Sequence, residues 1–318
     1  MRSYIMRRVV LLIPTLFLVT LIVFFSVRFV PGSVVDIMSA QLSAAGGESI
    51  SRAQVEEMLG LDKPMYIQYF NWLGKAVQGD LGTSLWQKRD IVPDILRKIP
   101  ISLELGFLAI LTGLCISLPI GIYSAIRQDT IGDYVGRSVA ILFIAVPSFW
   151  LATMVVVFPA GWWGWSPQVQ YMPITENLGA NLLQFIIPGV IMGMVMSGTS
   201  MRMTRTMMLE VLRQDYIRTA WSKGLRERMV VIRHALRNAL IPVVTIVGMQ
   251  IPVLLGGSVI MEQIFNLPGM GRFMVEALNA RDYPIISGIN LCMASVILCV
   301  NLTVDLTYSL LDPRIKYR

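Results

Sequence analysis

The chain has little of the chemistry that soluble enzymes use. Charged residues make up only 15% of its 318 residues, and it contains one histidine and three cysteines. A soluble domain usually carries about 25% charged residues, and so few ligating side chains argue against a multi-ligand zinc site. Hydrophobic residues make up 55%, with a mean hydropathy of +0.63. This composition excludes an intrinsically disordered chain and favours a membrane protein over a water-soluble enzyme.

Sequence motifs for nucleotide or metal chemistry are also missing. The sequence has no G-x-x-x-x-G-K-[ST] loop to hold nucleotide phosphates and no H-E-x-x-H pair. The lone His234 has no Cys or His nearby in the sequence, so we interpret it as a loop or interface residue. If this protein moves a solute with ATP, another chain has to hydrolyse the nucleotide, and this chain is not itself an enzyme.

Six uncharged stretches are long enough to cross a bilayer, which takes roughly 20 apolar residues in a helix. They are Val9–Val27, Leu105–Ile126, Ser138–Thr175, Asn177–Met201, Asn238–Met261 and Tyr283–Val304. The third is too long for one span, so we expect a helix near Gly136–Phe158 followed by an interfacial loop with Trp162, Trp163 and Trp165. The predicted fold is an all-α integral membrane protein with six transmembrane helices, the first an uncleaved anchor.

The basic residues predict the orientation. Most of the 27 Lys and Arg residues lie in the amino terminus, in the loops after the second and fourth spans, and in the tail. The two short loops on the other face hold only Arg272 and Arg281. The positive-inside rule then places both termini in the cytoplasm. We expect one membrane domain over residues 1–318, with an extracytoplasmic insertion at 31–99 and a cytoplasmic loop at 202–237.

The insertion has two expected helices. Ser51–Leu59 begins with a capping box and Gly60 follows it as a helix-ending residue. Tyr66–Val77 places its aromatic and aliphatic side chains on one face, as an amphipathic helix does. The insertion is either a folded cap on the membrane domain or a docking surface for an external partner.

The 202–237 loop is basic and rich in helix formers, and Gly224 interrupts it. We expect two helices with a turn at Gly224, and Asp215 as the N-cap of Tyr216–Lys223. Ala220 and Gly224, four residues apart, would leave a small-residue patch that another chain can approach. The loop is either a solvated connector whose arginines fix the topology or a peg that inserts into a cytoplasmic partner.

The residues of this loop resemble those of a known family. Residues 215–225 read DYIRTAWSKGL, residues 234–242 read HALRNALIP, and further matching segments lie at 59–64, 68–69, 79–84, 265–271, 281–284 and 312–314. Together they are similar to ABC importer permeases, especially the B-type subunits of the peptide and nickel uptake branch. The chain departs from the broad importer motif Glu-Ala-Ala at Arg218-Thr219-Ala220. It also departs from the branch's Pro-Gly-Asp-Pro at Pro31-Gly32-Ser33-Val34.

The resemblance implies a pore subunit that imports dipeptides or oligopeptides by alternating access. Its expected partners are a second permease, two ATPase subunits that carry ATP and Mg, an extracytoplasmic solute-binding protein and the lipid bilayer, with no nucleic acid. The expected location is the cytoplasmic membrane of a bacterium or archaeon. The expected contacts with the ATPase are Asp215, Arg218, Thr219, Ala220, Ser222, Lys223, Gly224 and Leu225. Nickel chelates, glutathione and oligosaccharides remain alternative substrates, and an ATP-independent secondary transporter remains an alternative class.

Small and polar residues in the spans are candidates for the translocation path, although helix packing explains them equally well. They are Ser197, Gly198, Gln250, Pro252, Gly256, Gly257 and Asn290. Four ionisable residues lie near span ends, namely Arg28, Glu104, Glu262 and Asp305. We expect Arg28 and Glu104 to snorkel to the membrane surface, Glu262 to face the outer mouth, and Asp305 to form a hydrogen bond between helices or subunits.

Overall fold

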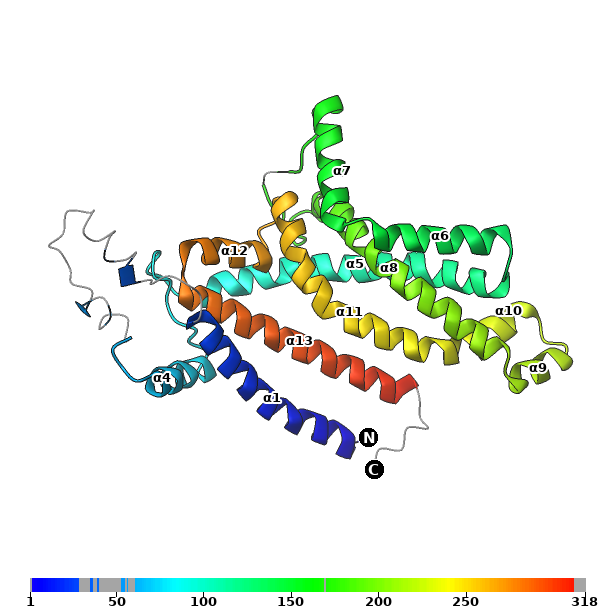
Figure 1. The fold of residues 1–318 in the computed structure, drawn as a ribbon, viewed down its shortest axis with the longest axis horizontal. Coiled ribbons are helices and arrows are strands. Elements are labelled where there is room, and N and C mark those ends of the chain that lie inside the picture. The colour runs from blue at the N-terminus through cyan, green and yellow to red at the C-terminus, as the bar shows by residue number, and fades with distance from the viewer. Residues whose placement is uncertain are drawn as a thin grey trace. The chain divides into compact units, whose positions relative to one another are not determined.

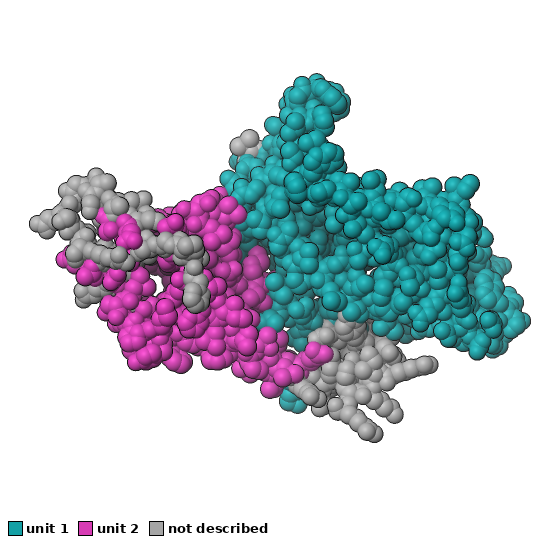
Figure 2. Space-filling model, viewed as in Figure 1, with its two compact units in different colours: residues 1–6, 98–272, 297–318 teal, residues 7–97, 273–296 magenta. Residues whose placement is uncertain are grey.

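The structure is a computed structural model that describes residues 2–28, 35–36, 39, 53–54, 56, 61–168 and 170–311. Its described elements are helices, apart from one isolated β-bridge between Thr83 and Asp90. The chain divides into two compact units (Figure 2). Unit 1 comprises residues 1–6, 98–272 and 297–318, and unit 2 comprises residues 7–97 and 273–296.

Five helical segments are long and apolar enough to cross a membrane, or six if one bent helix pair forms a single span. Four of these segments lie in single helices: α1 (Arg2–Arg28), α5 (Val92–Ile126), α8 (Leu178–Leu212) and α13 (Tyr283–Leu311). The remaining one is Glu227–Ile264, most of which is α11 (Arg237–Ile264). The expected all-helical membrane class is therefore confirmed.

The expected single helix near Gly136–Phe158 is wrong. Two helices occupy this stretch, α6 (Ile131–Ala145) and α7 (Ser148–Trp163), and they are bent by 88° relative to each other. Pro147 explains the bend, because a proline lacks the amide hydrogen that would continue α6 and pushes the preceding residue out of the helical region. Val146 accordingly has extended angles, and α7 points away from α6 and α8 (Figure 1).

Close helix contacts hold unit 1 together. α8 packs against α6 and α11, and small residues allow α5 and α8 to approach. A Cβ on Gly193 of α8 would lie 2.8 Å from the Ala109 carbonyl oxygen of α5. Buried Leu105, Phe185 and Met196 belong to the core between these helices. Backbones can approach this closely in membrane bundles only where side chains are small.

α8 begins at an N-cap and continues well beyond the predicted span end at Met201. The Asn177 side chain accepts a hydrogen bond from the Ala180 amide at 3.0 Å, which stabilises the first turn. The helix then runs to Leu212, so the first part of the 202–237 loop is a continuation of the span rather than a separate helix. Counting uncharged residues ends a span at the first arginine, whereas the helix itself continues as long as its residues favour the helical conformation.

Unit 2 contains α1 from Arg7 onward, α4 (Met65–Val77) and parts of α12 (Met270–Ala280) and α13. The predicted amphipathic helix at Tyr66–Val77 is confirmed by α4, but only part of its aromatic face is buried. Tyr69 is 4% exposed and hydrogen-bonds Thr20 of α1 at 2.8 Å, whereas Tyr66 and Phe70 remain exposed. α12 was not expected from the sequence.

The 79–84 and 281–284 segments meet within unit 2. Ser84 donates a hydrogen bond to the buried Asp282 carboxylate at 2.5 Å, and the Leu85 amide donates to the same group at 3.1 Å. Trp86 Nε1 donates to the Ala280 carbonyl oxygen at 2.7 Å. These bonds fix the end of the insertion to the start of α13. The expected Ser51–Leu59 helix, Gly60 and the 31–34 and 312–314 segments lie mainly or wholly outside the described residues.

Candidate functional site

The 202–237 segment contains several short elements after α8. α9 (Asp215–Ser222) is followed by a turn at Gly224, α10 (Glu227–Met229), the π-helix η1 (Val230–Leu236) and then α11. α9 and α10 lie together at one end of α8 (Figure 1). Helices on both sides of Gly224 were predicted, and both are present. The seven-residue π-helix was not predicted, and such stretches are frequent at functional sites.

An apolar cluster fixes α9 to the rest of unit 1. Ile217 of α9 is fully buried against Met208 of α8 and against Val230 and Ala235 of η1. Ala125, near the end of α5, belongs to the same cluster. Three chain segments therefore hold one side of this short helix, which would be only marginally stable by itself.

Ala220 also belongs to this buried cluster, with 5% of its surface exposed. The expected open patch of Ala220 and Gly224 is therefore not found, because the two residues face different surroundings. Gly224 is exposed and has φ +73°, with no atom within 4 Å of a Cβ built on it. Leu225 is half-buried and packs against the cluster.

The opposite side of α9 is open and mostly polar. We call it the α9 outer face, and it consists of Asp215, Tyr216, Arg218, Thr219, Trp221, Ser222 and Lys223. Asp215 is the first residue of α9 rather than its N-cap, which is Gln214 without a side-chain cap bond. The Asp215–Arg218 ion pair measures 3.4 Å and is almost fully exposed, so it adds little stability. A face of this kind is available for a partner.

Tyr216 connects α9 to the segment that leads into α11. Its hydroxyl accepts a hydrogen bond from Asn238 Nδ2 at 2.8 Å and lies 3.4 Å from the His234 carbonyl oxygen, to which it donates. Sequence reasoning missed Tyr216, although its position on a helix between basic residues was a usable signal. His234 lies in η1 rather than in a loop, and it takes part in this contact through its backbone carbonyl.

Three of the candidate path residues have partners within unit 1. Ser197 is buried and its hydroxyl donates to the Met194 carbonyl oxygen at 2.7 Å. A Cβ on Gly198 would lie 2.6 Å from the Ala140 carbonyl oxygen of α6, so this glycine serves helix packing. Gln250 of α11 donates to Ser200 of α8 at 3.1 Å.

The other candidates on α11 leave an open apolar surface. Gly256 and Gly257 are exposed and have nothing within 4 Å of a Cβ, and Pro252 is half-buried. Met249 and Val253 on the same helix are each 71% exposed. We call this surface the α11 open face. Asn290, half-buried on α13, belongs to unit 2.

Glu262 was expected to face the outer mouth, and the structure instead places it in the interior of unit 1. Its carboxylate is fully buried and accepts from Ser102 of α5 at 2.6 Å and from the Arg272 amide at 2.8 Å. Glu104 accepts from Asn181 of α8 at 3.5 Å rather than only snorkelling. Arg28 donates to Gln68 of α4 at 2.7 Å, which fixes its side chain. The Asp305 side chain lies outside the described residues.

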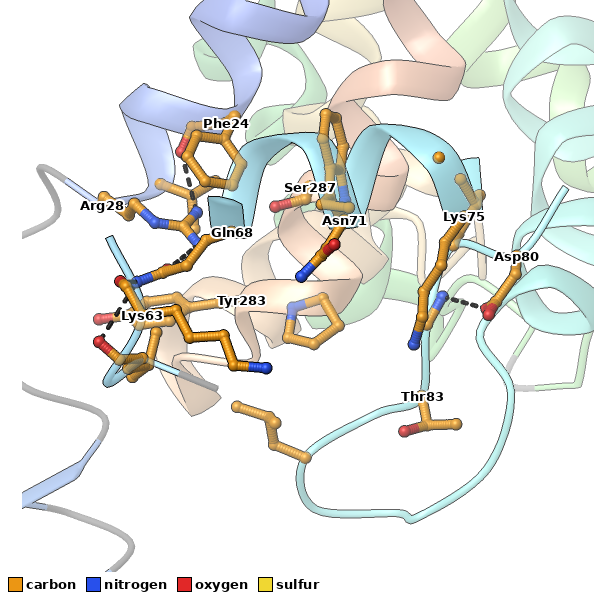
Figure 3. A pocket seen from close by; sticks show the side chains of 18 of the residues that line it. Phe24, Arg28, Lys63, Gln68, Asn71, Lys75, Asp80, Thr83, Tyr283 and Ser287 are labelled. Atoms are coloured by element: carbon orange, nitrogen blue, oxygen red, sulfur yellow. Dashed lines mark hydrogen bonds between the residues drawn. The ribbon is translucent and has the colours of Figure 1, made fainter. Parts of the chain in front are cut away.

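Unit 2 has a cavity of about 1050 Å³ between the end of α1, α4, the 79–84 segment and the start of α13. Asn71 and Lys75 of α4 point toward the segment that carries Thr83, and Lys63 reaches across the same opening (Figure 3). The lining combines aromatic rings with amide and ammonium groups, so it suits polar contacts. Among the described residues, no three His, Cys, Asp or Glu side chains gather to hold a metal ion.

Comparison with known protein families shows which family the chain belongs to. Residues 117–317 match the family "Binding-protein-dependent transport system inner membrane component", and residues 1–106 match its N-terminal counterpart. The chain belongs to this family. It is an ABC transporter permease subunit, a membrane pore component rather than a catalytic subunit.

Curated relatives match over the full length. The chain is 36% identical to the dipeptide transport system permease protein DppB of Escherichia coli (strain K12), with 100% of both chains covered. It is 38% identical to the protein of the same name from Alkalihalophilus pseudofirmus, again with full coverage of both. A solved chain of the MetNI methionine ABC transporter in an inward-facing conformation is similar in fold. That match has a TM-score of 0.56 and 15% identity, and covers 70% of this chain and 98% of the other.

Proposed function

We propose that this permease imports dipeptides and oligopeptides across the cytoplasmic membrane of a bacterium or archaeon. The observation that carries the proposal is α9, a short helix with one side fixed in an apolar cluster and a polar outer face left open. The dipeptide permeases that match over the full length support the substrate class. The bent pair α6–α7 counts as one span in this account, which gives six spans and places both termini in the cytoplasm.

The ATPase contact follows from the shape of α9. The chain has no phosphate-binding loop, so ATP and Mg would bind to other subunits. The resemblance to importer permeases implies two such ATPase subunits. The exposed residues Arg218, Thr219, Ser222 and Lys223 would meet the ATPase, with Asp215 and Gly224 at the edges of the contact. Ala220 and Leu225 would support this contact from within the cluster. Closure of the ATPases would displace α9 and switch the pore between inward-open and outward-open states.

The other partners would use the remaining open surfaces. A second permease would lie opposite the α11 open face, where the exposed Gly256 and Gly257 would leave room for a pore between the two chains. An extracytoplasmic solute-binding protein would dock on the insertion at 31–99, which supplies most of the lining of the unit 2 cavity. The pore would form between the two permeases, so Pro252, Gly256, Gly257 and Asn290 remain its candidate lining.

The test is uptake in a defined system. The chain is purified with its permease and ATPase partners, reconstituted in lipid vesicles, and supplied with the binding protein and a labelled dipeptide. We expect uptake only with ATP and Mg, and no uptake with a non-hydrolysable analogue. Labelled nickel chelate, glutathione and an oligosaccharide in parallel vesicles test the alternative substrates. Uptake by this chain without the ATPases would contradict the proposal and favour a secondary transporter.

A further inference from the structure

A buried carboxylate joins three helices of unit 1 next to α9. Asp133, in the first turn of α6, is 0% exposed. Arg205 of α8 binds it with two nitrogens, Nε to Oδ1 at 2.8 Å and Nη2 to Oδ2 at 2.7 Å. Ser124 of α5 donates to Oδ1, and the Asp129 amide donates to Oδ2 at 3.1 Å. Arg137 adds a more distant contact of 3.7 Å.

Stability alone is a weak reason for such a pair. Removing both charges from water costs free energy that the pair only partly recovers, and apolar residues of similar size often replace buried ion pairs without loss. A bidentate arginine, in contrast, fixes distance and orientation together. The arrangement therefore favours a positional role, in which the ion pair holds the start of α6 at a fixed position and orientation on α8.

The pair lies directly beside the cluster that holds α9. Ser124 precedes Ala125, and Arg205 stands one helical turn before Met208, and both Ala125 and Met208 belong to the α9 cluster. α5 and α8 therefore each contact both α9 and Asp133, through residues that lie close together on the same helix. α6 itself has no residue in that cluster among those described. It packs along α8 through apolar contacts, and the ion pair adds a directional contact between the start of α6 and the end of α8 nearest α9.

We propose that the Asp133–Arg205 pair transmits the displacement of α9 to α6, and so to the bent α6–α7 pair. This inference rests on the proposed function, because α9 moves only if an ATPase moves it. When α9 shifts, the apolar cluster shifts the adjoining ends of α5 and α8, and the bidentate pair keeps the start of α6 with them. Without the pair, ATP would be hydrolysed while α6 stays behind, and little peptide would cross.

The experiment measures peptide molecules imported per ATP hydrolysed in the reconstituted complex. Asp133→Asn keeps the shape of the side chain but leaves Arg205 buried without its counter-ion, so it also threatens folding. The double variant Asp133→Asn with Arg205→Gln removes both charges and relieves that penalty. We expect the double variant to assemble, to retain binding-protein-stimulated ATPase activity within about twofold, and to import about tenfold less peptide per ATP.

A matched control lies on α8. Arg202→Gln removes the charge of an exposed arginine one turn before Arg205. This variant should keep the wild-type ratio. A wild-type ratio in the double variant would overturn the inference. So would failure of the double variant to assemble, or an equal loss of ATPase activity and uptake, because each indicates a purely structural role. Wild-type vesicles without ATP-dependent uptake would instead overturn the proposed function, and this inference with it.

Discussion

Gly224 illustrates what a single residue decides in this protein. Its backbone has φ +73°, and nothing lies within 4 Å of where a Cβ would be. A side chain here would therefore be strained by the backbone angle and not by crowding. The sequence predicted that a helix ends at this residue. Glycine adopts positive φ angles more readily than other residues, so this prediction needed no information on tertiary packing.

Substitutions at Gly224 separate backbone strain from partner contact. Gly224→Asn should behave almost as the wild type, because Asn tolerates this angle. Gly224→Ala should cost about 1 kcal/mol of folding free energy. Gly224→Arg adds a long cation beside the α9 outer face and should abolish association with the ATPases while membrane insertion continues. Co-purification of the ATPase with the tagged permease measures this, and normal uptake by Gly224→Arg would refute the contact.

Glu262 is the second residue whose environment makes a clear prediction. Glu262→Gln replaces one acceptor oxygen with a donor group opposite either the Ser102 hydroxyl or the Arg272 amide. Leaving such a buried group unsatisfied costs about 1–3 kcal/mol. The thermal unfolding midpoint of the purified complex should fall. Glu176→Gln, at an exposed position, is the control and should leave it unchanged.

At the scale of elements, hydropathy located the spans because they bury continuous apolar surface in lipid. It could not show where a span bends or how far a helix extends beyond the membrane. Pro147 was one of several prolines in an apolar run, and only packing shows that it separates α6 from α7. The same limit applies to α8, which continues to Leu212, and to α12, whose first amide, that of Met270, donates to Ser102 of the distant helix α5.

Substitutions at two adjacent positions on α9 should have different effects, one on folding and the other on ATPase binding. Ile217→Asp places a charge in the apolar cluster and should lower the unfolding midpoint or prevent folding. Arg218→Asp changes the α9 outer face and should leave the midpoint unchanged, while weakening ATPase binding at least about fivefold. Thermal unfolding and a binding titration with the purified ATPase distinguish the two. Equal effects of both variants on unfolding would contradict the two-sided description of α9.

At the scale of the whole molecule, the sequence predicted the transporter class because several short motifs occur together and in order along the chain. The α9 outer face and the α11 open face both remain exposed in the single chain. The sequence could not show that Ala220 faces inward, because which side of α9 is buried depends on α5, α8 and η1. It also gave no signal for the Asp133–Arg205 pair, whose members are far apart in the chain.

Site-specific cross-linking tests the central claim most directly. Cys115, Cys292 and Cys299 are free thiols, so they are first replaced by alanine or serine. Ser222→Cys on the α9 outer face and Thr83→Cys in the insertion are then labelled with a short maleimide that carries a photoreactive group, which on illumination bonds to any neighbouring chain in the assembled complex. The account predicts a covalent product with the ATPase from Ser222→Cys, increased or decreased by ATP, and none from Thr83→Cys. A complex that hydrolyses ATP and imports peptide, yet gives no ATPase product from Ser222→Cys, would contradict it.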